Sequence, residues 1–212
     1  CVEECPSGTY SVAATSTCED CIAGKFSGAT GATSEATCKD CEAGKYSGQA
    51  ASLCQDCVAG KYSDQAASAC SDCEAGKYSG ATWASSCTDC GVGKYSATTG
   101  ATSEATCQDC AAGKYSSSTG AASESACTIC PQGSYTDMEA STTCPSCPAG
   151  RFNSDDATSS SLHNSLSTCS ICPAGKYNPD LATDPALHTS CEACLPGKFN
   201  ADNAVSTMLH DD

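Results

Sequence analysis

The amino-acid sequence predicts small disulfide-rich repeats, arranged as an elongated tandem array with short β-hairpins and turns, little helix and no large hydrophobic core. Three observations predict this fold class: cysteine occupies 22 of 212 positions, large aliphatic side chains are scarce, and one short motif recurs along the chain. A cysteine content above roughly 8–10% is typical of disulfide scaffolds. Such chains rely on covalent staples because they cannot bury enough apolar surface.

The recurring motif reads C-x-x-C-x-x-G-K-Y-S, as at positions 38–47, and its glycine occurs eleven times. The glycine can adopt a positive φ and turn the chain into a short strand. The aromatic residue two positions later is expected to cover the adjacent cystine. The lysine between them can meet an acidic residue that precedes the second cysteine of a motif, at Asp20, Asp40, Asp56, Asp72, Asp89 and Asp109.

Cysteine spacing ranks the possible disulfide pairings. Bonds inside each C-x-x-C would repeat the small ring of redox enzymes along the whole chain. Bonds across the variable stretch close loops of roughly 14–23 residues, and a loop of about 15 residues is worth about 3 kcal/mol in the chain-entropy model. The favoured pairs are Cys5–Cys18, Cys21–Cys38, Cys41–Cys54, Cys57–Cys70, Cys73–Cys87, Cys90–Cys107, Cys110–Cys127, Cys130–Cys144, Cys147–Cys169 and Cys172–Cys191.

The repeats fall into two groups. Residues 1–147 hold about eight short units of roughly 16–20 residues, whose variable stretches are expected to form turns with one helical turn at most. Residues 148–212 hold three longer units with Asn-x-Asp and Leu-His. Cys1 and Cys194 remain unpaired in the favoured scheme, so the chain is expected to be a fragment of a longer array.

Composition excludes several classes of partner. The formal net charge is −15 with only ten basic residues, whereas nucleic-acid binding needs clustered Lys and Arg. No apolar run approaches the roughly 18 residues of a membrane-spanning helix. So many expected disulfides require an oxidising compartment, and we therefore expect an extracellular protein, either secreted or at the cell surface.

The pattern C-x-x-G-x-[YF], closed by a later cysteine, resembles the ephrin-receptor-like cysteine-rich repeats. Each unit is also similar to the first submodule of tumour-necrosis-factor receptor cysteine-rich domains. The resemblance implies the same spanning disulfide. Tandem arrays of this type are similar to stretches of large surface and appendage proteins of protists and algae.

Three histidines, His163, His188 and His210, stand in register after a leucine in the long units. Imidazole can bind metal or titrate near neutral pH, but the favoured interpretation is that each Leu-His packs its loop against its own unit. The C-x-x-C pairs could hold zinc, and the Asn and Asp residues could hold calcium. An oxidising setting and the lack of a dense carboxylate cluster disfavour both, so we expect no metal and no cofactor.

Two further features concern the surface. Trp83 is the one tryptophan and the one candidate for a binding hot spot, a role that tryptophan often fills. No Asn-x-Ser/Thr sequon occurs, but hydroxyl-rich runs in expected loops are candidates for O-glycosylation. These are Thr98, Thr99, Ser116, Ser117, Ser118, Thr119, Ser159, Ser160 and Ser161.

The sequence therefore predicts an extracellular structural protein that forms a stiff rod, stalk or filament segment. Its expected partners are copies of itself or other extracellular structural proteins. The alternative is an ectodomain stalk or a binding module for a protein ligand at a cell surface. An enzyme is not expected, because a linear array of like units offers neither a concave pocket nor a nucleophile paired with a base.

Overall fold

The computed structural model describes residues 4–12, 17–178 and 184–196. The predicted positions Cys1 and His210 therefore lie outside the described residues. The chain divides into two compact units. The first comprises Cys1–Cys90 and Ser96–Cys107, and the second comprises Gly91–Tyr95 and Gln108–Asp212.

Ten disulfides each join the second cysteine of one motif to the first cysteine of the next. We number the repeats 1 to 10 by these bonds. They are Cys5–Cys18, Cys21–Cys38, Cys41–Cys54, Cys57–Cys70, Cys73–Cys87, Cys90–Cys107, Cys110–Cys127, Cys130–Cys144, Cys147–Cys169 and Cys172–Cys191. Among the described cysteines, Cys194 is a free thiol.

A tight turn opens each repeat. In repeat 2 the amide of Lys25 donates to the carbonyl of Ile22 at 3.0 Å, and Gly24 between them has φ +88°. A positive φ at the third position of a four-residue turn is the type II arrangement, which favours glycine. The turn delivers the chain into the first strand of a hairpin.

Each hairpin pairs the Lys-aromatic segment with the two residues inside the next C-x-x-C. In repeat 3, for example, Lys45 lies opposite Asp56 and Tyr46 opposite Gln55. The linker between successive disulfides is therefore itself a hydrogen-bonded strand.

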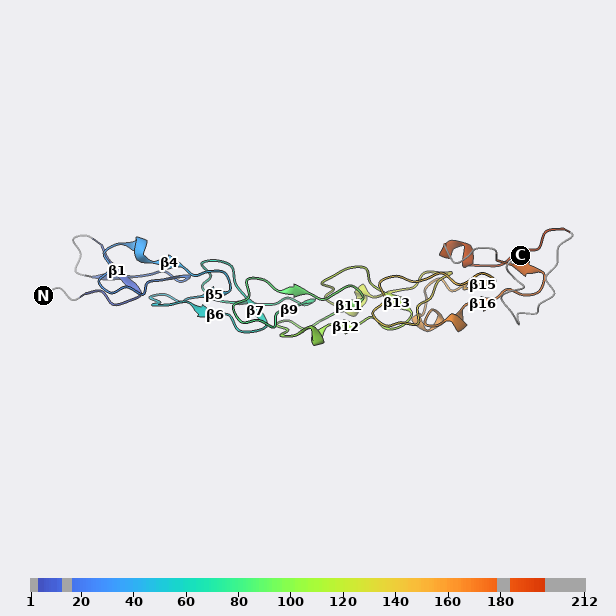
Figure 1. Ribbon diagram of the computed structural model, residues 1–212, viewed down its shortest axis with the longest axis horizontal. Helices are drawn as coiled ribbons and strands as arrows, with labels where there is room; N and C mark the ends of the chain where they lie inside the picture. Colours follow the sequence, from blue (N-terminus) through green and yellow to red (C-terminus); the bar gives the residue numbers. More distant parts are fainter. Residues whose placement is uncertain (1–3, 13–16, 179–183, 197–212) are drawn as a thin grey trace. The chain divides into compact units, whose positions relative to one another are not determined.

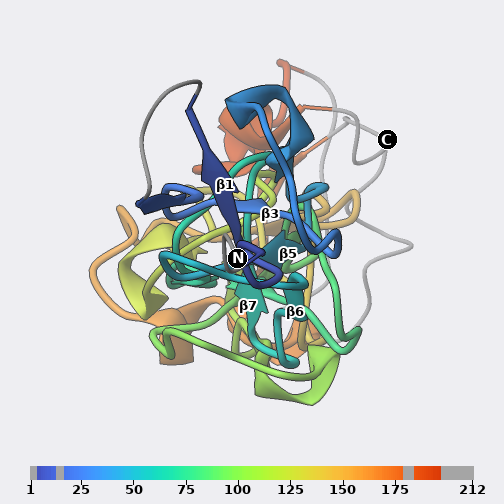
Figure 2. The ribbon, with the colours of Figure 1, turned by 90° about the vertical axis from the view of Figure 1, so that its left-hand side faces the viewer.

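Nine antiparallel pairs of this kind are described, labelled in part in Figure 1. They are β1 (Thr9–Ser11) with β2 (Cys18–Asp20), β3 (Lys25–Phe26) with β4 (Lys39–Asp40), β5 (Lys45–Tyr46) with β6 (Gln55–Asp56), β7 (Lys61–Tyr62) with β8 (Ser71–Asp72), β9 (Lys77–Tyr78) with β10 (Thr88–Asp89), β11 (Lys94–Tyr95) with β12 (Gln108–Asp109), β13 (Lys114–Tyr115) with β14 (Thr128–Ile129), β15 (Arg151–Phe152) with β16 (Ser170–Ile171), and β17 (Lys176–Tyr177) with β18 (Glu192–Ala193). The strands β1, β3, β5 and β7 of the first unit do not join into one sheet (Figure 2).

Repeat 8 departs from this pattern for a chemical reason. Pro145 occupies the linker between Cys144 and Cys147, and proline has no amide hydrogen to donate. The hairpin is reduced to a single antiparallel bridge between Ser134 and Ser146. The Pro145 carbonyl still accepts from the amide of Tyr135 at 3.0 Å.

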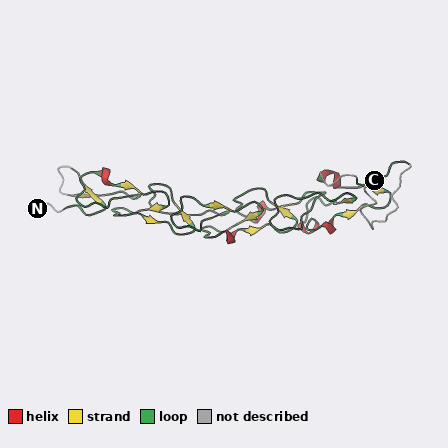
Figure 3. Ribbon diagram, viewed as in Figure 1, coloured by secondary structure: helices red, strands yellow, loops and turns green. Residues whose placement is uncertain are grey.

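Helical structure in the described residues is limited to single turns of 3-10 helix, drawn red in Figure 3. The side chain of Ser34 caps one turn by accepting from the amide of Ala36, and Ser103 caps another in the same way. The turns are η1 (Glu35–Thr37), η2 (Glu104–Thr106), η3 (Glu124–Ala126), η4 (Ser160–Leu162), η5 (Leu166–Thr168) and η6 (Pro185–His188).

The buried material is cystine rather than aliphatic side chain. In the first unit, Tyr10 clusters with Ala32 and with the Cys21–Cys38 disulfide of the following repeat. Second cysteines of the motifs, such as Cys41, Cys73 and Cys90, are fully buried. These observations confirm the predicted class of small disulfide-rich repeats with short hairpins and little helix.

Candidate functional site at the junctions between repeats

Successive repeats in the first unit are joined by the same three backbone hydrogen bonds. Between repeats 3 and 4, the amide of Gly44 donates to the backbone carbonyl of Ser63 at 2.8 Å, and the amide of Ser47 donates to the carbonyl of Ala67 at 3.2 Å. In return, the amide of Ala66 donates to the carbonyl of Cys41 at 2.8 Å. Because few apolar groups are available, backbone bonds and disulfides together define each junction.

The turn glycine also lies against the backbone of a residue two repeats further along the chain. A Cβ placed on Gly44 would lie 2.0 Å from the carbonyl oxygen of Trp83, two repeats further along. Gly8 faces Ala50, Gly24 faces Ala66, and Gly60 faces Gly100 in the same way. Glycine is therefore favoured at this position for two reasons: it adopts the positive φ, and its lack of a Cβ allows another backbone to approach closely.

The second unit repeats both features. The amide of Gly113 donates to the backbone carbonyl of Thr136 at 2.8 Å, and the amide of Ser116 donates to the backbone carbonyl of Ser141 at 3.0 Å. A Cβ on Gly113 would lie 2.2 Å from the carbonyl oxygen of Ser160. Repeat 7 thus contacts repeats 8 and 9, just as repeats 1 to 4 each contact the next two repeats within the first unit. These contacts extend further than the disulfides alone reach.

The predicted lysine–aspartate pairs form within hairpins. Lys25, Lys61 and Lys77 each lie 2.6 Å from the carboxylate of Asp40, Asp72 and Asp89, respectively. Lys45–Asp56 and Lys94–Asp109 are equivalent pairs. The hydrogen bond from Lys77 to Asp89 raises the pKa of that lysine, and the attraction of the carboxylate adds to the effect.

Several positions depart from this pairing, Asp20 and Lys114 among them. Asp20 lies opposite Thr9 rather than a lysine, and its carboxylate instead accepts from the Gln49 side chain at 3.1 Å. Lys114 lies opposite Ile129 and pairs with Glu124 at 2.7 Å. The hydrogen bond from Lys114 lowers the pKa of Glu124, and the charge of the lysine contributes further.

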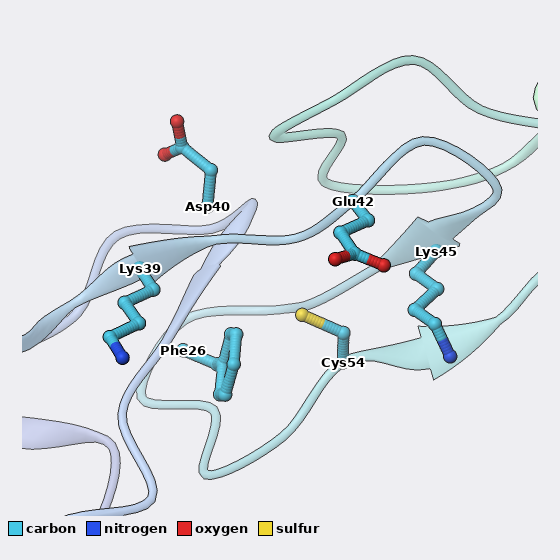
Figure 4. Close-up of a pocket in the computed structure, with 6 residues that line it drawn as sticks. All are labelled: Phe26, Lys39, Asp40, Glu42, Lys45 and Cys54. Atoms are coloured by element: carbon cyan, nitrogen blue, oxygen red, sulfur yellow. The ribbon is translucent and has the colours of Figure 1, made fainter.

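Shallow pockets recur beside these pairs. One of about 370 Å³ is lined by Phe26, Lys39, Asp40, Glu42, Lys45 and Cys54, and Figure 4 shows the Phe26 ring between Lys39 and Cys54. A second of about 300 Å³ lies one repeat on and includes Tyr46, Val58 and Lys61. Asp40 and Lys45 in the first pocket take part in hairpin ion pairs with Lys25 and Asp56, and Phe26 adds an aromatic face.

Trp83 is displayed on the surface. Its side chain is 62% exposed, and its φ of +54° is a conformation that bulky residues rarely adopt. Equivalent residues in neighbouring repeats of the first unit are Ala66 and Gly100, which also have positive φ. The amide of Trp83 donates to the backbone carbonyl of Cys57 at 2.8 Å, and this hydrogen bond connects Trp83 to the preceding repeat.

The long repeats replace the usual serine and alanine of a junction by asparagine and histidine. Asn153 and His163 are buried in repeat 9, and Asn178 and His188 are buried in repeat 10. The amide of Asn153 donates to the carbonyl of His188 at 2.8 Å, as Ser47 donates to Ala67 in a short repeat. From the sequence, each Leu-His is expected to pack its loop against its own unit. The imidazoles of His163 and His188 are enclosed and contact Asp155 and Asn178 of their own repeats, whereas Leu162 and Leu187 remain exposed.

The His163 imidazole has polar partners on both sides. Nδ1 lies 2.8 Å from the carbonyl oxygen of Ser134, and Nε2 lies 2.9 Å from Oδ2 of Asp155. Hydrogen bonds from Thr158 lower the pKa of Asp155, and the bond from His163 acts in the same direction against the opposing effect of burial. No group of three or more His, Cys, Asp or Glu among the described residues is placed to hold a metal ion.

The candidate glycosylation positions differ in access. Thr98, Thr99, Ser117, Ser118, Thr119 and Ser161 are exposed, whereas Ser159 and Ser160 are half-buried. Ser116 is only 4% exposed, and its backbone bonds to repeats 6 and 8. This burial removes Ser116 from the candidate set, because its position is the junction serine rather than part of the loop that follows.

Together these features define a class of protein, namely tandem disulfide-stapled hairpins joined through their backbones. Residues 60–107 and 120–163 match the family described as tyrosine-protein kinase ephrin type A/B receptor-like. Those two segments are ephrin-receptor-like cysteine-rich repeats, and the described repeats around them have the same disulfide and turn. No curated protein matches the chain. None of the helices in the described segments is long and apolar enough to cross a membrane.

Proposed function

We propose that this chain is a structural segment of an extracellular protein and acts as a stiff rod, stalk or filament element. The observation that carries the proposal is the junction, in which the same backbone bonds recur and turn glycines such as Gly44, Gly60 and Gly113 lie against the backbone two repeats further along. Such contacts join near neighbours in sequence, and a protein built from them is quasi-one-dimensional. Its length is then set by the number of repeats.

The extracellular setting is supported by the disulfides and by the receptor-like family of the matched segments. Disulfides persist where the compartment is oxidising. A spacer needs no catalytic centre, and each repeat presents nearly the same side chains as its neighbours. We expect lateral or end-on partners to be copies of the chain or other extracellular structural proteins.

Electron microscopy of the non-reduced protein with repeats removed or added tests this function. Deletion of residues 41–72 removes repeats 3 and 4 but keeps the C-x-x-C spacing, since Asp40 would precede Cys73. We expect elongated particles that shorten by roughly 20–40 Å, given about 10–20 Å per repeat. A second copy of residues 41–72 should lengthen them equally. Compact particles of unchanged dimensions in both variants would refute a spacer.

A second candidate function, binding of a protein ligand, is favoured by Trp83 alone. Exposed tryptophan at a strained backbone position is a feature of recognition sites. Because Trp83 is the one tryptophan, its emission reports its surroundings directly. We expect the emission of a water-exposed indole that does not change as the protein is concentrated. A blue shift on concentration that coincides with self-association would favour binding through this residue.

A further inference from the structure

His163 lies at the junction between repeats 8 and 9 and has no access to solvent. Its exposed fraction is 0%. The ring lies between the carbonyl of Ser134 in repeat 8 and the carboxylate of Asp155 in repeat 9. Its own backbone carbonyl accepts from the amide of Thr136 at 2.8 Å. The residue therefore connects the two repeats through both its backbone and its side chain.

The shortest contact of each ring nitrogen of His163 is with an oxygen that accepts hydrogen bonds: the Ser134 carbonyl at 2.8 Å from Nδ1 and the Asp155 carboxylate at 2.9 Å from Nε2. A carbonyl oxygen has no proton to give, so Nδ1 must donate to Ser134. The carboxylate of Asp155 already accepts from the amide and the hydroxyl of Thr158, which fits the ionised form. Nε2 must therefore donate as well, and a histidine that donates from both nitrogens is an imidazolium.

The one competing contact is longer. The side-chain nitrogen of Asn153 lies 3.3 Å from Nδ1, whereas the Ser134 carbonyl lies at 2.8 Å. The same Asn153 amide donates to the carbonyl of Leu162 at 2.8 Å. Since hydrogen bonds weaken with distance, the shorter contact decides that Nδ1 carries a proton.

Short repeats show what the imidazolium replaces. The hydroxyl of Ser47 donates to the carbonyl of Lys25 in the preceding repeat, and Ser63 donates to Lys45, each at 2.9 Å. In the long repeats the corresponding carbonyl is that of Ser134 or Arg151, and it faces the Nδ1 atom of His163 or His188. At the Ser134 carbonyl a ring that can carry charge thus stands where a short repeat has a neutral hydroxyl, whereas the Arg151 carbonyl also accepts from the side-chain amide of Asn178 at 3.2 Å.

We propose that the buried His163 imidazolium, paired with Asp155, is a pH-sensitive fastener between repeats 8 and 9. Asp155 is the carboxylate in contact with the ring. The other charged or titratable groups on the segments packed here are five. They are Tyr135, which lies between Ser134 and Thr136; Asp137, which follows Thr136; Asp156, which is exposed; His188, whose Nδ1 faces the Arg151 carbonyl; and Arg151, whose guanidinium donates to the carbonyl of Cys169.

The direction of the pH dependence follows from the extra proton that His163 carries when the junction between repeats 8 and 9 is closed. The closed junction keeps a proton on each nitrogen of His163, whereas an opened junction exposes an ordinary imidazole, which titrates near about pH 6.5. Closing therefore takes up a proton, and the junction weakens as the pH rises above that value. At the acid end the lowered pKa of Asp155 preserves its charge until the pH falls through that lowered value.

Amide hydrogen exchange on the full disulfide-bonded chain measures the strength of this junction. The amide of Thr136 bonds to His163 across it, and the amide of Ser116 makes the equivalent bond to Ser141 where no histidine is present. After correction for intrinsic exchange, we expect Thr136 protection relative to Ser116 to fall by up to about tenfold per pH unit above about pH 6.5. An unchanged ratio between about pH 5.5 and about pH 8.5 would overturn the proposal.

Nitrogen chemical shifts of the His163 ring in the unaltered protein provide a direct readout. Both nitrogens should show protonated-type shifts at neutral pH, and a bare Nε2 would contradict the fastener. Asp155→Asn should remove the pH dependence at Thr136, whereas Asp156→Asn, the exposed neighbour, should keep it. His163→Gln should lower Thr136 protection below neutral pH and make it insensitive to pH. Equal profiles for Asp155→Asn and the unaltered chain would also overturn the assignment.

Discussion

Glycine is the residue on which each junction depends most. At Gly44 the backbone has φ +86°, and an added methyl group would collide with the carbonyl of Trp83. We predict that Gly44→Ala destabilises the oxidised protein by more than about 1–2 kcal/mol, since a left-handed conformation alone costs about that much for an alanine. Denaturant unfolding followed by circular dichroism measures the loss.

Gly48 provides the matched control for this substitution. It lies four residues away in the same repeat, and a Cβ built there meets nothing within 4 Å. Gly48→Ala should therefore leave the unfolding midpoint nearly unchanged. Equal effects from the two substitutions would show that the close approach of the repeat after next does not constrain the turn.

The Lys114–Glu124 pair gives a prediction for an exposed ion pair. Lys114 donates to Glu124 at 2.7 Å, and this hydrogen bond lowers the pKa of the carboxyl group. The stabilisation from this pair is present above the pKa of glutamate in the unfolded chain and is lost as the pH falls through the lowered value. Carboxyl carbon NMR should show Glu124 titrating below the ordinary glutamate range.

Lys114→Gln is the control, because it removes the charge and keeps a side chain of similar length. In that variant the Glu124 carboxyl group should titrate closer to its ordinary value. The difference should also shrink in high salt, since exposed charges are screened. A Glu124 titration that is the same with and without Lys114 would show that the pair does not persist in solution.

At the scale of the element, the repeat is a hairpin held by one disulfide and one turn. Spacing and composition were sufficient to predict the turn glycine, because Gly44 and its equivalents recur at a fixed offset from cysteine. They also predicted the Lys45–Asp56 type of pair, since both residues flank the same motif. Local sequence encodes such features because the partners lie within one repeat.

Contacts between repeats were less accessible to sequence reasoning. The approach of the Trp83 carbonyl to Gly44 depends on the path of a backbone two repeats away, and no side-chain pattern records it. The link from His163 to Ser134 is also formed through a carbonyl. A signal did exist: asparagine replaces the junction serine in the same units that acquire histidine, as at Asn153 and Asn178.

Disulfides rather than metal or an apolar core should account for the stability of each hairpin. We predict that reduction of the protein abolishes its structure in any buffer, whereas a chelator has little effect, because no aliphatic core replaces the lost staples. Circular dichroism and protease sensitivity can follow both treatments. Unfolding by EDTA alone would show that metal binding holds the repeats.

Mass mapping of non-reduced peptides tests the pairing itself. Cleavage after Lys25 and Lys39 separates Cys21 from Cys41 while leaving Cys38 with the peptide that contains residues 26–39. The Cys21–Cys38 bond should therefore link the peptide ending at Lys25 to the peptide ending at Lys39. A bond between Cys38 and Cys41 instead would contradict the spanning pattern.

Within the part of the chain that the structure describes, the backbone contacts of the turn glycines join a repeat to the next repeat and to the one after it. The linkers between disulfides are short hydrogen-bonded strands, as in β6 between Cys54 and Cys57. Strands of this kind leave little freedom for bending. We therefore expect the repeats to continue along one direction, with nothing that draws distant repeats together.

Small-angle X-ray scattering of the oxidised protein measures whether the repeats extend along one direction in solution. Ten disulfide-bonded repeats that each advance about 10–20 Å span roughly 100–200 Å, and a thin rod of that length has a radius of gyration of about 30 Å or more. A globular protein of this chain length would have a radius of about 17 Å. We predict a value in the rod range that decreases when residues 41–72 are deleted. A radius near the globular value would contradict both the extended array and the structural function proposed for it.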